Sequence, residues 1–165
     1  CHKRPLVSNL LFRNFPHGYE DMDVKIDLVT EEEKERWPKD VIVPLPDPFV
    51  DARGAIQPLV DEDMKSCVLI SSKKGTVRAN HYHKTDWHYC YVMMGKIEYY
   101  HRPTGSDAPP EKVMVEAGQM FFTPPMVDHS MVFPEEAVFI TWGRNSRLQE
   151  VYEADVVRID PIEPS

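Results

Sequence analysis

Short apolar runs separated by turn residues fill the chain from Phe49 onward, and this pattern limits the folds that the chain can adopt. Side chains alternate along these runs. In one of them, His88 shares a strand face with Cys90 and Val92, as period-two geometry requires. Runs of this length and spacing predict an all-β fold, built as an antiparallel sandwich or barrel. The runs span residues 56–60, 66–71, 87–94, 96–101, 112–115, 120–123, 129–133, 137–142 and 156–159.

Residues 1–48 differ in texture and predict an N-terminal arm attached to a β-domain of residues 49–165. Thr30 followed by Glu33 matches a capping box, which predicts a short surface helix. The proline-spaced stretch 41–48 follows that helix. Because proline cannot donate to a central β-ladder, we expect this stretch to pack as an extended arm along a sheet edge.

Composition limits the partners and the compartment of this 165-residue chain. The formal net charge of -8 and the lack of a basic cluster argue against a nucleic-acid-binding groove, which needs concentrated positive charge. Three scattered cysteines form no disulfide framework, which favours the cytoplasm. No apolar stretch approaches the roughly 20 residues that span a bilayer. We therefore expect a small-molecule substrate and no membrane or nucleic-acid partner.

Four histidines fall into two clusters, each framed by glycine and proline: His81, His83 and His88 in the first, and His129 in the second. Residues two apart on a strand project from the same face, so His81 and His83 suit two ligands of one ion. A barrel interior can bring all four imidazoles together around a first-row divalent metal. The remaining histidines lack such a frame and are expected on the surface: His2, His17 and His101.

The two histidine segments resemble the paired motifs of the cupin superfamily, G-x5-H-x-H-x3/4-E-x6-G and G-x5-P-x-G-x2-H-x3-N. The positions in register are Gly75, His81, His83, Gly95, Gly118, Pro124 and His129. This resemblance implies a double-stranded β-helix, the cupin jelly-roll barrel. His88 stands where the family usually has glutamate, while Met126 and Phe133 replace glycine and asparagine. Losing the anionic ligand favours Fe, Ni, Cu or Zn over Mn.

A second resemblance covers roughly residues 49–142. The segments around Asp51–Arg53 and Arg78–His83 look like the D-x-R-G-x-[LI] and R-G-x-H-x-H-[KR] elements of cupins that act on nucleotide sugars, with Ala79 in place of a glycine. Those cupins are the dTDP-4-dehydrorhamnose 3,5-epimerase-like proteins and the dTDP-4-keto-6-deoxyhexose 3,4-ketoisomerases. The resemblance implies an isomerase or epimerase acting on a nucleotide sugar.

This second resemblance also implies roles for individual residues. In a metal-free enzyme, His81 and His83 would form the proton-transfer pair, because isomerisation beside a ketone needs a base and an acid. Arg53 and Arg78 would meet the diphosphate of the substrate. The two tyrosines expected as proton donors are Tyr82 and Tyr91.

A competing interpretation uses the same histidines as metal ligands, and a ligand cannot also act as a free base. His88 and His129 are not needed for a two-histidine relay yet fit a metal shell, so metal binding is the primary expectation. The candidate bases are then Asp86, Glu98 and Asp128. Two alternatives stay open: a metal-dependent oxygenase, and a non-catalytic sugar-binding or regulatory cupin.

Aromatic residues at strand spacing predict core or interface positions. They are Tyr89, Tyr91, Tyr99, Tyr100, Phe121, Phe122 and Trp142. Cupins of this size commonly pair by exchanging or packing edge strands, so we expect a homodimer with the N-terminal arm as the exchange element.

Overall fold

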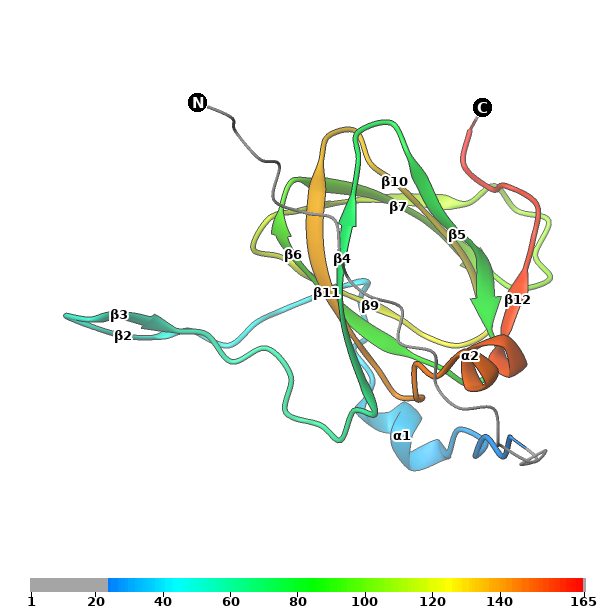
Figure 1. Cartoon of the computed structure of the whole chain (residues 1–165), viewed down its shortest axis with the longest axis horizontal. Coiled ribbons are helices and arrows are strands. Elements are labelled where there is room, and N and C mark those ends of the chain that lie inside the picture. Colours follow the sequence, from blue (N-terminus) through cyan, green and yellow to red (C-terminus); the bar gives the residue numbers. More distant parts are fainter. Residues whose placement is uncertain (1–23, 165) are drawn as a thin grey trace, which may run out of the picture.

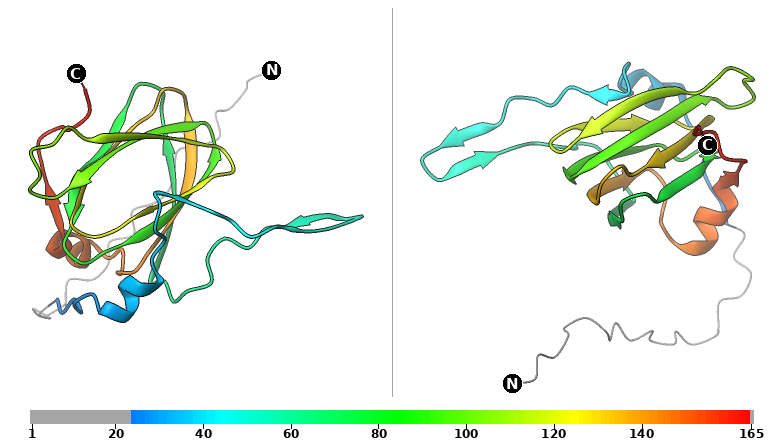
Figure 2. Two further views of the ribbon diagram at one scale, coloured as in Figure 1. Left: turned by 180° about the vertical axis from the view of Figure 1, so that it is seen from behind. Right: turned by 90° about the horizontal axis from the view of Figure 1, so that it is seen from above.

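The computed structural model describes residues 24–164, and two facing five-stranded sheets form its barrel (Figures 1 and 2). The sheet orders are β1-β9-β6-β11-β4 and β12-β5-β10-β7-β8, with all pairs antiparallel. The barrel strands are β1 (Ile42–Val43), β4 (Ser66–Ser72), β5 (Val77–His83), β6 (His88–Met94), β7 (Lys96–Pro103), β8 (Glu111–Glu116), β9 (Met120–Thr123), β10 (Val127–Val132), β11 (Ala137–Gly143) and β12 (Val156–Arg158). The predicted all-β class is confirmed.

The chain winds between the two sheets as a double-stranded β-helix does. Strands β4 to β7 alternate from one sheet to the other, and strands β9 to β12 do so again. This alternation places the histidine-bearing strands β5 and β10 side by side in one sheet and β6 in the facing sheet. The predicted jelly-roll barrel is therefore confirmed.

The predicted arm is tied to the barrel by its helix and by one short strand. Helix α1 (Glu31–Arg36) has the predicted capping box, in which the Thr30 hydroxyl accepts from the Glu33 amide at 3.1 Å. Arg144 Nε donates to Glu33 Oε1 at 2.5 Å, and this pairing lowers the pKa of Glu33 to about 2. Strand β1, within the predicted edge-packing stretch 41–48, pairs with β9 at the sheet edge.

Two apolar clusters hold the structure together. The first fills the barrel interior and includes Tyr99 and Phe121, both fully buried. The second lies on the outer face of the sheet that contains β6 and β9, where Tyr89 and Phe122 pack beneath side chains of the arm such as Trp37. These aromatic residues occupy the core positions that their strand spacing predicts.

Three segments differ from the sequence expectations. Residues 56–60 do not form a barrel strand: β2 (Phe49–Asp51) and β3 (Gly54–Ile56) make a separate hairpin that projects from the barrel (Figures 1 and 2). Strand β5 is absent from the predicted apolar runs because most of its residues are polar. A second helix, α2 (Gln149–Asp155), is also unpredicted. Within the described residues, no helix is long and apolar enough to cross a membrane.

A β-bulge in β5 aims the side chains around the histidines. Along β10, His129 pairs with His81, but the next residue, Ser130, pairs with Ala79, so Asn80 is extra. Ala79 and Asn80 both have positive φ angles, 69° and 54°. An extra residue reverses the side-chain alternation beyond it. Arg78, opposite Met131, consequently faces the same interior as His81.

Replacing Ala79 with glycine is expected to stabilise the fold by about 1 kcal/mol, because an L-residue at positive φ is strained and glycine is not. Urea unfolding would measure the gain. Ala117→Gly is the matched control, since Ala117 is exposed and has no positive φ. Glycine there should lower stability through chain entropy. An equal loss in the two variants would show that the bulge is unstrained.

Candidate functional site

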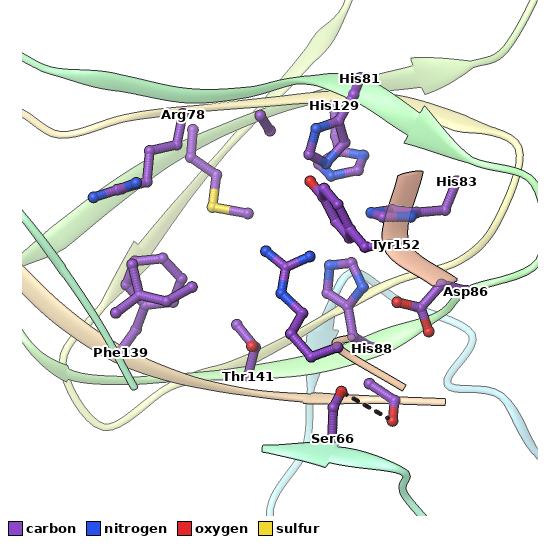
Figure 3. A pocket seen from close by; sticks show the side chains of 15 residues that line it. Ser66, Arg78, His81, His83, Asp86, His88, His129, Phe139, Thr141 and Tyr152 are labelled. Carbon is purple, nitrogen blue, oxygen red and sulfur yellow. Dashed lines mark hydrogen bonds between the residues drawn. The ribbon is translucent and has the colours of Figure 1, made fainter. Parts of the chain in front are cut away.

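A cavity of about 170 Å³ opens between the two sheets, and the four predicted histidines line it (Figure 3). Its wall combines ionisable side chains with an apolar floor formed by Ile70, Met131 and Phe139. The other ionisable or hydrogen-bonding side chains of the wall are Ser66, Arg78, Asp86, Thr141, Arg147 and Tyr152. A cavity of this composition suits part of a small polar substrate.

The histidine rings come from three strands and meet in this one cavity. The ring centroid of His81 lies 4.8 Å from that of His83 and 4.7 Å from that of His129. His88, from the facing sheet, lies 5.5 Å from His83 and 6.0 Å from His129. Their ligand atoms form two groups of mutual neighbours within 4.8 Å: His81, His83 and His129, and His83, Asp86 and His88.

Hydrogen bonds fix the tautomers of two of these histidines. His129 Nδ1 lies 3.0 Å from the Val127 carbonyl, and His83 Nδ1 lies 3.0 Å from Asp155 Oδ2. A carbonyl and a carboxylate only accept, so each Nδ1 carries a proton, and the Nε2 of neutral His129 keeps a free lone pair. His129 Nε2 is buried and has no hydrogen-bond partner within the described part of the chain.

The environment keeps His81, His88 and His129 neutral. Burial, with a smaller contribution from the neighbouring imidazoles, lowers the pKa of His81 to about 2, and burial lowers that of His129 to about 3. Burial also holds the pKa of His88 well below its usual range. Neutral imidazoles that converge with free lone pairs have the chemistry of metal ligands.

The free energy of unfolding of the metal-free protein is expected to fall more steeply with decreasing pH than its surface charges alone would cause. The unfolded chain binds protons at these histidines below about pH 6.5, while the folded chain resists them down to about pH 3, so stability falls as the pH drops through this range. Each histidine contributes up to about 1.4 kcal/mol per pH unit. Urea unfolding at several pH values would measure the slope, and His88→Gln should reduce it. A slope unchanged by that substitution would contradict the prediction.

The carboxylate behind His83 is itself held by several donors. Asp155 Oδ1 accepts from the Thr85 amide and hydroxyl at 2.7 and 2.6 Å, and Oδ2 accepts from the Asp86 amide at 3.1 Å as well as from His83. Burial alone would raise the pKa of Asp155, but these bonds outweigh it and lower the pKa to about 2. The charged carboxylate therefore orients His83.

Helix α2 and the loop before it contribute residues that the sequence reasoning missed. The Tyr152 ring centroid lies 5.7 Å from that of His83 and 6.4 Å from that of His81. Arg147 Cζ lies 3.7 Å from the centroid of the Tyr152 ring. One sequence signal was available: Tyr152 and Asp155 are three apart, a spacing that puts both on one face of a helix.

The structure places the two predicted tyrosines outside the cavity. Tyr82 lies between His81 and His83, so strand alternation turns it to the opposite face. Tyr91 lies on the outer face of β6 and packs against the second apolar cluster. Neither can donate a proton inside the cavity, and Tyr152 is the tyrosine that lines it.

The predicted charged residues divide between the cavity and the outside. Arg78 lines the cavity, whereas Arg53 occupies the turn between β2 and β3 and pairs with Asp51. Among the candidate bases, only Asp86 lines the cavity, and burial raises its pKa. Glu98 pairs with Lys112 instead.

Two further expectations need correction or fall outside the structure. Asp128 pairs with Arg102, with Oδ2 3.3 Å from the arginine Nε, and so is engaged away from the cavity. His101 is not a surface residue as predicted: it is partly buried and stacks on Tyr99, with ring centroids 5.3 Å apart. The other two histidines expected on the surface, His2 and His17, lie outside the described residues.

Comparison with known proteins identifies the architecture. Neither a protein-family model nor a curated protein matches the sequence. A dTDP-4-dehydrorhamnose 3,5-epimerase from Sulfolobus tokodaii is 19% identical with a TM-score of 0.57, over 70% of this chain and 74% of that one. QdtA, a sugar 3,4-ketoisomerase from Thermoanaerobacterium thermosaccharolyticum, is 16% identical with a TM-score of 0.56, over 69% and 84%. The chain has the cupin fold.

A third similar structure is CapF, a capsular polysaccharide assembling protein from Staphylococcus aureus. It is 21% identical with a TM-score of 0.53, and the likeness covers 72% of this chain but 35% of CapF. The predicted resemblance to nucleotide-sugar epimerase and ketoisomerase cupins is thus confirmed for the fold. The function must be argued from the residues of the cavity.

Proposed function

We propose that the protein is an isomerase or epimerase of a nucleotide sugar or a related carbohydrate, with a divalent transition metal bound by the histidine cluster. The main support for a metal is that His129 Nε2 is buried beside His81 and His83 and has no hydrogen-bond partner within the described residues. A buried nitrogen without a hydrogen bond is costly unless another group binds it. The fold shared with an epimerase and a ketoisomerase supports the reaction class.

The residues of the cavity fit a metal of the Fe, Ni, Cu or Zn group. His81, His83 and His129 offer three imidazoles, and Asp155 accepts from the far nitrogen of His83, as carboxylates behind metal-bound histidines do. The predicted fourth ligand, His88, lies on the facing sheet, where its ligand atoms group with those of His83 and Asp86. When bound, the metal would polarise the carbonyl of the substrate and stabilise negative charge on its oxygen.

The proton transfers fall to residues that do not bind the metal. Asp86 is the proposed base: its Oδ1 accepts from the Asn145 amide at 2.8 Å, which leaves Oδ2 for the carbon-bound proton of the substrate. Its raised pKa brings its proton affinity nearer to neutral pH. Tyr152 is the proposed proton donor, and Arg147 beside it stabilises the enolate oxygen.

Two measurements test this function. Elemental analysis of protein expressed in metal-replete medium should find close to one transition metal ion per chain, and a metal-free active protein would overturn the metal centre. Incubation with dTDP-4-keto-6-deoxyglucose in D₂O should introduce deuterium beside the ketone. If no position exchanges in the metal-loaded protein, the isomerase proposal fails, and oxygen uptake would then test the oxygenase alternative.

We also propose that the protein is a homodimer in which the β2–β3 hairpin docks on a second copy. Its apolar residues Phe49, Val50 and Ile56 are 60–66% exposed, and the hairpin stands clear of its own barrel (Figure 2). Sequence reasoning assigned the exchange to the arm, yet β1 of that arm pairs within its own chain.

A triple variant with serine in place of Phe49, Val50 and Ile56 is expected to be a monomer, because the substitutions remove the apolar surface that association would bury. Size-exclusion chromatography with light scattering would measure the mass. Leu148→Ser is the control, since Leu148 is 62% exposed but lies beside α2. A dimer that survives the triple change would rule out the hairpin as the contact.

A further inference from the structure

The extra residue of the β5 bulge, Asn80, is held by the C-terminal segment through three hydrogen bonds. Its carbonyl accepts from the Ile159 amide at 3.0 Å. Its side-chain Oδ1 accepts from the Ile162 amide at 3.3 Å, and its Nδ2 donates to Glu163 Oε1 at 3.2 Å. A backbone amide only donates and a carboxylate only accepts, so the orientation of the Asn80 side chain is fixed. We call these three bonds the C-terminal clasp.

The C-terminal segment is suited to hold Asn80 in one position. The Ile162 side chain is buried and anchors the segment on the barrel. Pro161 and Pro164 restrict the backbone on either side of Ile162 and Glu163. Burial alone would raise the pKa of Glu163, but hydrogen bonds, among them the one from Asn80, outweigh it and lower the pKa. The Asn80 amide therefore meets a charged acceptor, which makes a stronger hydrogen bond than a neutral one.

The same stretch of chain follows the histidine-bearing half of β5. Asp155, just before β12, contacts His83, and β12 then pairs with β5 from His83 to His81. The C-terminal clasp at Asn80 comes next along β5. Residues 155–163 thus contact β5 continuously, from the carboxylate behind one histidine to the bulge that precedes the other.

The clasp acts at the point that determines which way His81 faces. Ala79 and Asn80 both have positive φ angles, which are unfavourable for residues other than glycine, although asparagine tolerates them better than most. The bulge needs further contacts to keep its place. A bulge displaced by one residue along β5 would change the residue opposite His129 and the face that His81 presents.

We propose that the C-terminal clasp fixes the orientation of His81 in the cavity, with Asn80 and Glu163 as positioning residues. The consequence for metal affinity rests on the proposed function, because it takes His81 as a metal ligand. Residues 159–163 do not line the cavity, yet they become determinants of how tightly the histidine cluster binds its ion.

Reversing the polarity of the bond between Asn80 and Glu163 tests the clasp. Asn80→Asp keeps the size of the side chain, its tolerance of positive φ and an acceptor for the Ile162 amide, but it sets a second carboxylate against Glu163. Glu163→Gln alone keeps an oxygen that accepts from the Asn80 amide. In the double variant Asn80→Asp/Glu163→Gln, the new amide donates to the new carboxylate, so the bond is restored in the opposite direction.

Titration with Co²⁺ should show about tenfold weaker binding and an altered visible spectrum in Asn80→Asp. Glu163→Gln should resemble the original protein, and the double variant should recover both affinity and spectrum. A bond that only supports the fold would lower stability to urea without changing the spectrum. Glu153→Gln is the matched control, since it breaks the pair with Arg158 in the same part of the chain and should leave Co²⁺ binding unchanged.

A second variant covers the case in which Asn80→Asp does not fold. Glu163→Ala removes the acceptor of the Asn80 amide and leaves the bulge sequence intact. The same loss of Co²⁺ affinity is expected, because Asn80 then loses one of its three bonds to the C-terminal segment.

NMR of the metal-free protein separates this inference from the proposed metal centre. The imidazole signals of His81 should shift in Asn80→Asp and return in the double variant. If the original protein binds no Co²⁺ but these signals move and return, the metal centre fails and the clasp stands. If Co²⁺ binds, and its affinity and the His81 signals are unchanged in Asn80→Asp and Glu163→Ala, the metal centre stands and the clasp does not position His81.

Discussion

Glutamine in place of His129 is expected to abolish metal binding and turnover together while the barrel remains folded. The Nε2 atom of His129 has no partner within the described fold, so the substitution gives up only the contact of Nδ1 with the Val127 carbonyl. It does remove one of three converging imidazoles. Losing a ligand should weaken metal affinity by at least about 100-fold, because changing a residue that only hydrogen-bonds to a ligand already costs about 10–100-fold. Titration with Co²⁺, followed by its visible absorption, would measure the affinity.

His101→Gln is the control for this substitution. His101 is the register partner of His129 on β7 and is partly buried, but it does not line the cavity. The control should keep Co²⁺ binding and deuterium exchange near those of the original protein. If His129→Gln still binds Co²⁺ with the same affinity and spectrum, His129 is not a ligand and its free nitrogen needs another explanation.

The sequence predicted most of the barrel because the local signals agreed with the tertiary structure. The Thr30–Glu33 capping box and the run 120–123 depend on neighbours in the sequence, and each occurs where it was expected. Strand β5 lacks this agreement. Several of its residues are polar because they face a cavity, and the bulge at Asn80 shifts the alternation of its side chains. A search for alternating apolar residues therefore does not detect this strand.

The histidines were predictable from their spacing, whereas their supporting residues were not. His81 and His83 share a face on any extended strand, and the cupin motif supplied His129. Asp155 is 72 residues from His83 in the sequence and lies on a helix that no sequence motif predicts. The prediction that Tyr82 donates a proton in the cavity was wrong because neighbouring residues in a strand point to opposite faces. Tyr82 lies next to His81 and His83 and therefore points away from them.

Asparagine in place of Asp155 is expected to lower both stability and metal affinity. The carboxylate accepts four hydrogen bonds, two at each oxygen, and all four partners are donors. An amide has only one oxygen, so its NH₂ group must face two donors on one side. Leaving buried donors unpaired should cost about 1–3 kcal/mol. If the NH₂ group faces His83, the ring must accept at Nδ1, and its Nε2 then carries the proton and cannot bind metal.

Thr85→Val separates the structural effect from the effect on the metal. It removes the Thr85 hydroxyl from the same carboxylate but leaves the His83 contact intact. Both variants should therefore lose stability to urea, whereas only Asp155→Asn should weaken Co²⁺ binding, by about 10–100-fold. Equal Co²⁺ affinity in the two variants would limit Asp155 to a structural role. The carboxylate acts through the tautomer of His83. The loss of Co²⁺ affinity in Asp155→Asn should therefore persist under conditions that restore the stability of this variant. Such persistence would show that Asp155 orients a metal ligand and does not only support the fold.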